Sequence, residues 1–209
     1  SKIFRSEATY ALVSDAGTPL ISDPGYKLVL EAVQADLPVI AVPGPSAVTA
    51  ALSIAGLPTD RFLFEGFLPR KQSARTERLS ELIGLSYTVV IFESPQRIRA
   101  LVETIANVLG AKRKLVLVRE ITKLHEQVYR GPVSSIKLLL DAEKIVLKGE
   151  FVVLIGPDSA AKTNGEMQRV LDIILPLTDK KTAVKIAKAL TGESRNAIYE
   201  HLVGKTHGA

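Results

Sequence analysis

Two short segments of the chain concentrate residues that can hold a ligand with their main chain. The sequence SDAGTPLISDPG spans Ser14 to Gly25, and VPGPSA spans Val42 to Ala47. Each follows an apolar run and precedes a helical pattern, and open α/β sheets bind ligands at the carboxyl ends of their strands. The glycines let the main chain approach a ligand closely, and the prolines hold each loop in a preformed shape. The alternative is a pair of tight turns with helix caps, in which Ser46 is an N-cap.

Charged side chains gather after two later apolar runs, where they could take part in acid–base chemistry. These runs end in FESPQR and REITKLHE, and the residues that could project toward one cleft are Glu93, Arg97, Glu120, Lys123, His125 and Glu126. A carboxylate or an imidazole can take a proton from a substrate hydroxyl, and a cation can stabilise the charge that develops on oxygen. Strand ends are also often exposed to solvent, so a plain surface role for these residues stays open.

Several common kinds of site are absent from the sequence. Neither the P-loop pattern nor the GxGxxG fingerprint occurs, which disfavours ATP and NAD, and GPSAV is not the GxSxG elbow of serine hydrolases. With no cysteine and three scattered histidines, the chain has no thiolate metal site, and we expect no metal. No apolar run reaches the length of a membrane span and no signal peptide is recognisable, so we expect a cytoplasmic protein that does not enter a membrane.

The elements that must position these residues alternate between apolar strands and amphipathic helices. Apolar runs predict strands at 10–13, 38–42, 61–69, 87–94, 114–122 and 149–156. Helical spacing predicts helices at 26–34, 46–55, 75–83, 96–109 and 134–142. Regular alternation of this kind is typical of α/β proteins with largely buried strands. With 209 residues and 46% hydrophobic content, the chain can bury such a core.

The C-terminal part of the chain has a different pattern. A linker of small and polar residues, GPDSAAKTNGE, precedes three short helical patterns at 167–175, 181–190 and 195–202. Short helices joined by a glycine-containing turn resemble a helix-turn-helix unit, and the alternative is a helical hairpin docked on the body. We therefore expect three parts. Residues 1–58 belong to a first α/β domain, residues 59–158 form a second one, and residues 159–209 form a linker and a basic helical tail.

The charge of the chain favours a polyanionic partner. The net charge is +5 with a pI near 9.4, and basic residues concentrate in PRKQSARTER, AKRK and DKKTAVKIAKAL. Each phosphate that a cation neutralises releases a counterion and adds to affinity for nucleic acid. A lysine-rich surface without a partner is the alternative. The residues that we expect to contact RNA are Arg70, Lys71, Arg97, Lys181, Lys185 and Arg195.

Five blocks of sequence, in this order, resemble a known family. They are ALVSDAGTPLISDPGY, VPGPSAVTAALSIAGLPTDRFLFEGFLPRK, FESPQRI, LVREITKLHE and KGEFVVLIG, and with the tail the match runs from about Ala8 to Val203. The chain resembles the tetrapyrrole methylase superfamily, and within it the bacterial 16S rRNA cytidine 2′-O-methyltransferases. The resemblance implies two α/β domains with S-adenosylmethionine in the cleft between them. It also implies a homodimer that methylates a cytidine ribose of 16S rRNA in the decoding region of the 30S subunit.

The same resemblance assigns residues to the cofactor. The positions that match the family's cofactor contacts are Ala16, Gly17, Thr18 and Ile21 in the first loop, Ser46 and Ala47 in the second, Phe92 and Glu93 along the adenosine, and Ile121 to Leu124 at the last strand end. Thr18 stands where relatives often have aspartate. Family members also begin with a strand and a loop like TPIGNLGD, followed by an AEDTR segment. Neither occurs in this chain, so we expect one wall of the cofactor site and part of the RNA cleft to be missing.

Methyl transfer is an in-line displacement, so the resemblance implies an enzyme that mainly aligns the ribose oxygen with the methyl donor. The candidate general bases are Glu93, Glu120 and His125, and the candidate stabilising cations are Arg97, Arg119 and Lys123. The sequence does not rank them. Two other functions stay open. One is methylation of a small tetrapyrrole or another anionic metabolite by the same cofactor fold, and the other is RNA binding by a fragment that does not bind the cofactor.

Overall fold

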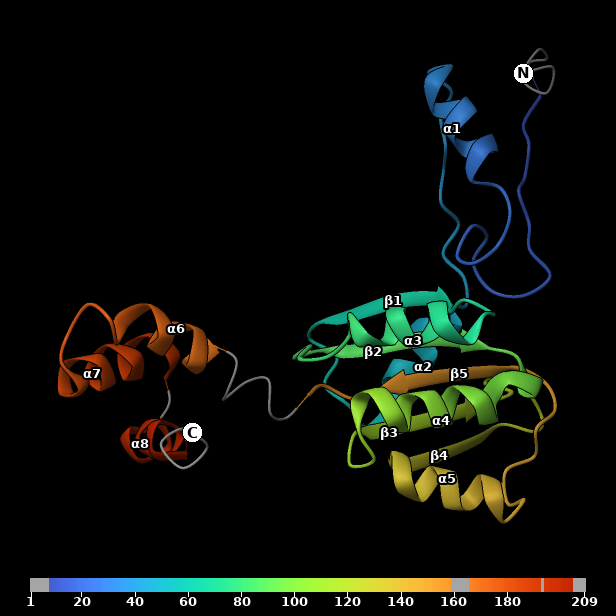
Figure 1. Cartoon of the computed structure of the whole chain (residues 1–209). Coiled ribbons are helices and arrows are strands. Elements are labelled where there is room, and N and C mark those ends of the chain that lie inside the picture. Colours follow the sequence, from blue (N-terminus) through green and yellow to red (C-terminus); the bar gives the residue numbers. More distant parts are fainter. Residues whose placement is uncertain (1–7, 159–165, 193, 205–209) are drawn as a thin grey trace.

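A five-stranded mixed sheet forms the centre of the computed structural model, which describes residues 8–158, 166–192 and 194–204 (Figure 1). The strands are β1 (Phe62–Phe67), β2 (Thr88–Glu93), β3 (Lys114–Arg119), β4 (Gln127–Pro132) and β5 (Phe151–Ile155). Their order is β1-β2-β5-β3-β4, with β1 and β2 parallel and every other neighbouring pair antiparallel. The carboxyl ends of β1, β2 and β3 therefore lie at one edge of the sheet.

Helices cover both faces of this sheet because β2, β3 and β5 are apolar on both sides. The helices are α2 (Ala47–Ala55), α3 (Gln72–Ser80), α4 (Ile98–Leu109) and α5 (Val133–Asp141), with a short 3-10 helix, η2 (Pro95–Arg97), before α4. Alternate residues of one strand point to opposite faces. Thus Leu117 packs in the cluster with α3, α4 and α5, whereas Val116 packs in the cluster with α2.

Helix α4 shows why these segments are helical. Its buried positions Ile98, Leu101, Val102 and Ile105 recur at helical spacing and form one apolar stripe against the sheet. The helix ends at Gly110, whose φ of 90° most other residues avoid. The predicted helices at 26–34, 46–55, 96–109 and 134–142 are confirmed to within two residues at each end. The predicted helix at 75–83 is shifted, because α3 begins at Gln72 and ends at Ser80.

The segment of residues 8–46 is packed very differently, and Figure 1 shows its helix α1 (Tyr26–Gln34) apart from the sheet. Ala32 is the one residue of this segment that is buried. The strands predicted at 10–13 and 38–42 are wrong for this structure, since none of the described residues pairs with them. The main-chain N–H and C=O groups of a strand need a neighbouring strand as their hydrogen-bond partner. Their apolar side chains stay in solvent, with Val13 80% and Ile40 82% exposed.

The described part of the tail contains three helices, α6 (Glu166–Ile174), α7 (Lys180–Thr191) and α8 (Arg195–Gly204), as the sequence predicts. They pack on one another through a small apolar cluster of Leu171, Val184, Ala187, Ile198 and Leu202. The Asp179 side chain caps α7 by accepting from the main-chain N–H groups of Lys181 and Thr182. No described helix is long and apolar enough to cross a membrane.

Candidate functional site

The two loops that the sequence singles out lie against each other. The Thr18 hydroxyl donates a hydrogen bond to the main-chain carbonyl of Pro45, with an oxygen–oxygen distance of 3.0 Å. A Cβ on Gly17, where φ is 76°, would lie 3.8 Å from the same carbonyl oxygen. Ser46 follows directly and precedes α2 in extended conformation, without a side-chain cap bond. Thr18 therefore binds the main chain next to Ser46, just before the amino end of α2.

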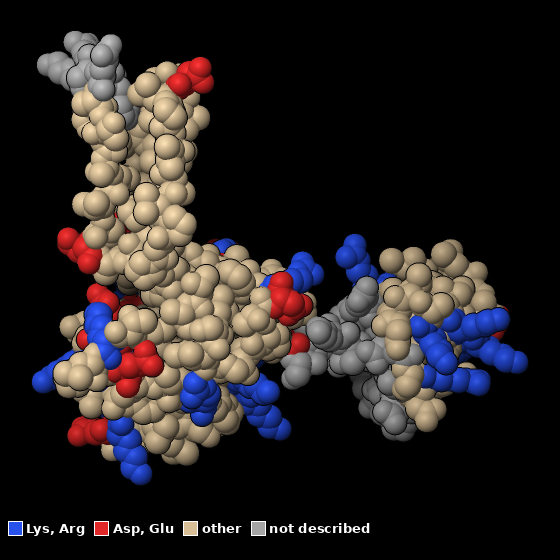
Figure 2. All heavy atoms as spheres, turned by 180° about the vertical axis from the view of Figure 1, so that it is seen from behind, with Lys and Arg blue, Asp and Glu red and all other residues tan. Residues whose placement is uncertain are grey.

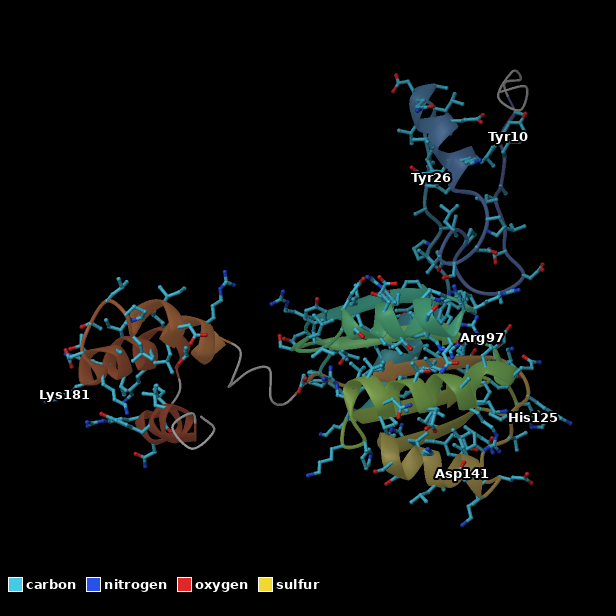
Figure 3. All side chains as sticks on the ribbon, in the orientation of Figure 1. Tyr10, Tyr26, Arg97, His125, Asp141 and Lys181 are labelled. Atoms are coloured by element: carbon cyan, nitrogen blue, oxygen red, sulfur yellow. The ribbon has the colours of Figure 1, made fainter. Side chains whose placement is uncertain are left out.

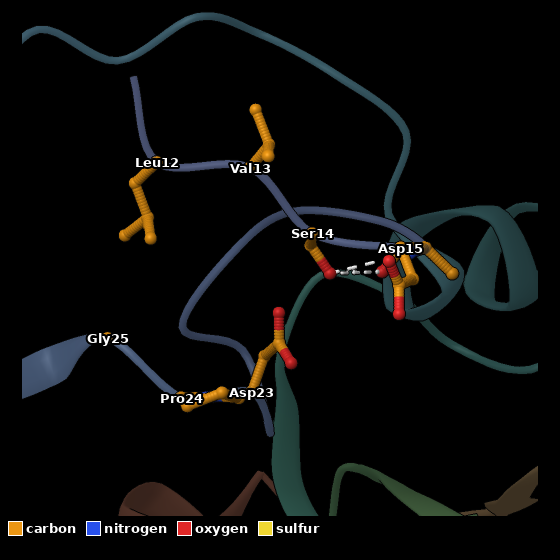
Figure 4. Close-up of a pocket in the computed structure, with 8 residues that line it drawn as sticks. Leu12, Val13, Ser14, Asp15, Asp23, Pro24 and Gly25 are labelled. Atoms are coloured by element: carbon orange, nitrogen blue, oxygen red, sulfur yellow. Dashed lines mark hydrogen bonds between the residues drawn. The ribbon is translucent and has the colours of Figure 1, made fainter. Parts of the chain in front are cut away.

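The first loop also borders an open hollow of about 480 Å³, shown in Figure 4. Its lining residues are Leu12, Val13, Ser14, Asp15, Ala16, Asp23, Pro24 and Gly25. The Ser14 hydroxyl donates to the Ala16 carbonyl at 3.1 Å and accepts from the Ala16 N–H at 3.4 Å, which holds the turn between them. A Cβ on Gly25 would come within 3.0 Å of the Leu12 and Leu20 side chains. The hollow is thus shaped by the polar turn and by close approach at a glycine.

Aromatic side chains meet at the carboxyl ends of β1 and β2. The Phe92 ring makes edge contacts with Phe64 and Phe67, at centroid distances of 4.9 and 5.8 Å. Phe67 remains 57% exposed, so one aromatic ring of this group is open to solvent. Strand β1 has a bulge between Phe64 and Gly66, and a Cβ on Gly66 would lie 3.0 Å from the Ser22 hydroxyl. The first loop therefore contacts the strand that carries these phenylalanines.

Glu93 is buried at the end of β2 in an ion pair with Arg97. Its Oε2 lies 3.2 Å from Arg97 Nη2, and its Oε1 accepts from the Ser94 N–H at 2.8 Å. The same Arg97 nitrogen donates to the carbonyls of Leu68 and Pro69, which join β1 to α3. Arg97, labelled in Figure 3, therefore ties the ends of the two parallel strands together. Neither side chain projects freely from the sheet edge.

The loop after β3 is held by a network of charges around Glu120. The Glu120 carboxylate accepts from the Glu150 N–H at 2.8 Å and from Lys123 Nζ at 3.1 Å, and Lys123 also pairs with the Glu150 carboxylate at 2.9 Å. The Glu150 N–H and Lys123 hold the pKa of Glu120 below its usual value, and the two carboxylates raise the pKa of Lys123. Glu120 is thereby a weaker base, and the Lys123 charge is largely balanced.

Two neighbours in the same loop point to solvent instead. Leu124 is 93% exposed, and the His125 side chain is exposed as well (Figure 3). The loop is anchored below them by buried Arg119, whose guanidinium donates to the carbonyls of Lys148 and His125 and to the Gln127 side chain. Arg119 is therefore engaged in the interior. Among the described residues, no group of three or more His, Asp or Glu side chains could hold a metal ion.

The basic candidates for RNA contact lie in two places. Arg70 and Lys71 are exposed between β1 and α3. Lys181 and Lys185 are exposed on α7, and Arg195 lies over the Tyr199 ring at the start of α8. Figure 2 shows Lys and Arg side chains gathered on the helical tail. Arg97 differs from the others because its guanidinium is engaged with Glu93 and two carbonyls.

Comparison with known proteins decides the family. The model of the tetrapyrrole (corrin/porphyrin) methylases matches residues 3–137 of the chain. The chain belongs to the tetrapyrrole methylase family. Its curated relatives in the family include a ribosomal RNA small subunit methyltransferase I from Xylella fastidiosa, 41% identical over 196 residues that cover 93% of this chain and 72% of the relative. The protein of the same name from Vibrio cholerae is 42% identical over 201 residues, covering 93% and 69%.

The solved structures similar to this tetrapyrrole methylase include uroporphyrin-III C-methyl transferase from Thermus thermophilus complexed with S-adenyl homocysteine. It has 16% identity and a TM-score of 0.44, and the match covers 67% of this chain and 62% of that one. The resemblance seen in the five sequence blocks is confirmed by the family model and by the curated relatives. The chain is accordingly a methyltransferase by family, and the relatives carry ribosomal RNA methylation in their name rather than methylation of a tetrapyrrole.

Three parts of the site are not among the residues selected from the sequence. These are the exposed ring of Phe67, the bulge at Gly66, and the contact of the Glu120 carboxylate with Gly149. A Cβ on Gly149 would overlap Glu120 Oε1. A glycine inside the strand pattern FLFEGF is a usable signal for a bulge. Nothing in the sequence pattern pairs Gly149 with Glu120, because that contact depends on how β3 and β5 align.

Proposed function

We propose that this chain binds S-adenosylmethionine where the loop of residues 14–25 meets Pro45, Ser46 and Ala47, and that it methylates the ribose 2′-hydroxyl of a cytidine in 16S rRNA. The observation that carries this proposal is the Thr18–Pro45 hydrogen bond, which joins, in a member of the methylase family, the two loops whose sequence predicts ligand binding. The protein acts in the cytoplasm on the 30S subunit and works as a homodimer. The substrate, the cytoplasmic location and the homodimer are thus proposals that go beyond the family assignment.

The residues where the two loops meet suit this cofactor. Ala16, Gly17, Thr18 and Ile21 offer main chain and small or apolar side chains, and Ser46 and Ala47 directly follow Pro45, whose carbonyl accepts from Thr18. The aromatic rings of Phe67 and Phe92 offer an apolar surface next to the same loop, since Ser22 touches β1 at Gly66. An adenine ring packs well on such a surface. When bound, the cofactor supplies a methyl group that an oxygen nucleophile can accept directly.

Among the candidate bases the geometry favours His125. Glu93 is buried in its ion pair with Arg97, and Glu120 is held by Lys123 and the Glu150 N–H in a way that lowers its pKa. His125 lies on the same loop with its ring exposed. We therefore assign His125 the removal of the proton from the ribose hydroxyl, and we assign Glu120 and Lys123 the shaping of the loop. A neutral imidazole within hydrogen-bond reach of the hydroxyl is the usual donor–acceptor arrangement for this step.

The RNA is proposed to lie along the basic groups near the sheet edge and on the tail. Arg70 and Lys71 follow β1 directly, whereas Arg97 orders the strand ends and contributes to RNA binding only indirectly. On the tail, Lys181, Lys185 and Arg195 are exposed cations on a small separate core. Each phosphate contact that is lost should reduce the slope of log affinity against log salt by about one.

The decisive experiment measures transfer of labelled methyl from S-adenosylmethionine to 30S subunits, with the modified nucleotide located by mass spectrometry of nuclease fragments. Thr18→Val removes the bond between the loops, and we expect about fivefold weaker cofactor binding by calorimetry, since one hydrogen bond contributes about 1 kcal/mol. Ser80→Ala, which removes a hydroxyl bond to the Thr76 carbonyl within α3, is the matched control and should bind the cofactor normally. Methyl transfer to a small tetrapyrrole but not to 30S subunits would contradict the proposal.

A second measurement tests the base. His125→Gln should lower the rate of methyl transfer by about a hundredfold while cofactor affinity stays unchanged, because a positioned general base contributes factors of that size. If Glu120→Gln lowers the methyl-transfer rate by about a hundredfold and His125→Gln does not, Glu120 is the general base instead.

A further inference from the structure

A groove between α3 and α4 contains none of the residues assigned above to the methyl-transfer site. It has a volume of about 350 Å³. Its lining residues are Gln72, Arg75, Thr76, Ala100, Glu103, Thr104, Asn107 and Val108. The two helices cover the sheet face opposite to α2. Most of these side chains are polar, which is unusual between two helices that pack on a common core.

The guanidinium of Arg75 is the unusual group in this groove. Arg75 is only 5% exposed, and its Nε donates to the Thr104 hydroxyl at 3.3 Å. That hydroxyl in turn donates to the Ala100 carbonyl at 2.7 Å. Within the described residues, no carboxylate forms an ion pair with Arg75 and no carbonyl accepts from it. A guanidinium carries five N–H donors and stays charged at any working pH, so most of its hydrogen-bonding capacity has no protein acceptor.

The other buried arginines of the described chain show what such a group normally acquires. Arg113 pairs with Asp158 at 2.9 Å and donates to the Gly156 carbonyl at 2.7 Å. Arg119 donates to two carbonyls and to the Gln127 amide oxygen. Burying a charge is costly unless acceptors replace the lost water. Arg75 is the exception among these three. Its N–H groups that lack a protein acceptor line a polar groove.

The remaining groups around Arg75 include donors that can hydrogen-bond to an anion. Gln72, Thr76 and Asn107 carry amide or hydroxyl donors along the groove. Glu103 contributes a carboxylate, but Lys137 Nζ is paired with it, so its negative charge is locally offset. The net charge of the groove therefore comes from Arg75. A planar guanidinium fork matches the oxygens of phosphate and carboxylate groups two at a time.

We propose that the groove between α3 and α4 binds a small oxyanion, a phosphate or carboxylate group, with Arg75 as its principal ligand and Thr76, Thr104 and Asn107 as polar neighbours. The bound anion supplies the acceptors that the protein lacks and holds α3 on α4. The inference is independent of the methyl-transfer proposal, because it concerns a different face of the sheet.

The test is thermal unfolding of the whole protein in phosphate, in acetate and in chloride at equal ionic strength. At about ten times its Kd, phosphate should raise the Tm by about 4 °C, and above Kd the Tm should go on rising with the logarithm of the phosphate concentration. Calorimetry with inorganic phosphate should give one site per chain. The acetate series tells whether a planar carboxylate serves as well as a tetrahedral phosphate. A failure of both anions to raise the Tm overturns the proposal.

Two variants locate the effect. Thr104→Asp places a carboxylate beside the Arg75 guanidinium, and we expect it to unfold at or above the wild-type Tm in chloride and to lose the response to phosphate. Arg75→Met keeps the apolar stem and should also lose the response. An equal rise in phosphate for the wild type and both variants would overturn the proposal, since it would mark a general salt effect. Should Arg75→Met fold poorly, Thr104→Asp and the wild-type calorimetry still decide.

Discussion

The central sheet and the segment of residues 8–46 have similar apolar sequences but opposite packing. Val118 in β3 is fully buried, whereas Ile40 in the run VIAV is 82% exposed. The first lies between two paired strands and under a helix, and the second has no strand partner among the described residues. An apolar run therefore becomes a strand only where neighbours complete its ladder. The candidate site joins these two regions, since Thr18 belongs to one and α2 packs on the other.

Hydrogen exchange should show the largest difference between the two regions. Amides of β2, β3 and β5 open only by global unfolding, while those of residues 8–24 lack a ladder, so protection should differ by about a thousandfold or more. Exchange followed by mass spectrometry of peptides measures it. Protection at residues 10–13 equal to that in β3 would break the comparison, because it would show that this run is paired in solution.

Truncation of one side chain in each region should give the next largest difference, in the free energy of unfolding. Leu117→Ala removes a fully buried side chain between β4 and β5, and we expect a loss of about 3 kcal/mol in the free energy of unfolding. Ile40→Ala, the matched change in the exposed segment, should cost less than about 0.5 kcal/mol. Urea unfolding followed by circular dichroism gives both values. Similar losses for the two variants would place Ile40 in the cooperative core.

Two glycines allow a finer test of the same difference. Gly149→Ala adds a Cβ against the Glu120 carboxylate, which is held by the Glu150 N–H, at a position where φ is 82°. We expect it to cost about 2 kcal/mol of stability. Gly25→Ala is also strained, at φ 128°, and meets leucine side chains, but it lies in a segment outside the packed core, so its effect on global unfolding should be several times smaller. The denaturant midpoints of the two variants provide the measurement.

The smallest expected effect is the pH dependence that comes from Glu120. Its pKa in the folded protein is lowered from the usual 4.5, first by the Glu150 N–H and then by Lys123. A lowered folded-state pKa contributes stability above the unfolded value, and that contribution disappears as the pH falls through the folded value. The Tm of Glu120→Gln should therefore lie below wild type at pH 7 and approach it at pH 3. If the Tm of Glu120→Gln lies below that of the wild type by the same amount at pH 7 and at pH 3, the lost stability comes from the geometry of the side chain and not from its charge.

The sequence predicts most of the sheet and its helices because their patterns are local. The run KLVLVR and the spacing of Ile98, Leu101, Val102 and Ile105 are sufficient to predict β3 and α4. Strand β4 does not follow from its residues QVYRGP, since arginine, glycine and proline interrupt any alternation. It forms because the loop that Arg119 anchors returns the chain alongside β3. The strands at 10–13 and 38–42 fail for the converse reason, since their pattern has no partner to pair with.

The candidate site shows the same division. The sequence predicts that the two loops follow neighbouring strands; those strands are absent from the described structure, and the Thr18–Pro45 hydrogen bond joins the loops instead. The positions of the charged candidates do not follow from spacing. Glu93 and His125 both follow an apolar strand pattern, yet Glu93 is buried in an ion pair with half-buried Arg97 and His125 is exposed. Burial of a charged side chain depends on contacts between distant elements, such as that of Arg97 with the Leu68 carbonyl.

The bulge in β1 determines which rings can meet. Phe64 and Phe67 are three residues apart, so a regular strand would send their side chains to opposite faces of the sheet. The extra residue between Phe64 and Gly66 shifts the count by one, and both rings reach Phe92 on the same side. Without the bulge, a strand that kept all its residues would pair Glu65 with Ile91 and turn Phe67 to the opposite face of the sheet. The aromatic surface beside the first loop thus depends on how an edge strand accommodates one extra residue as much as on the identity of its residues.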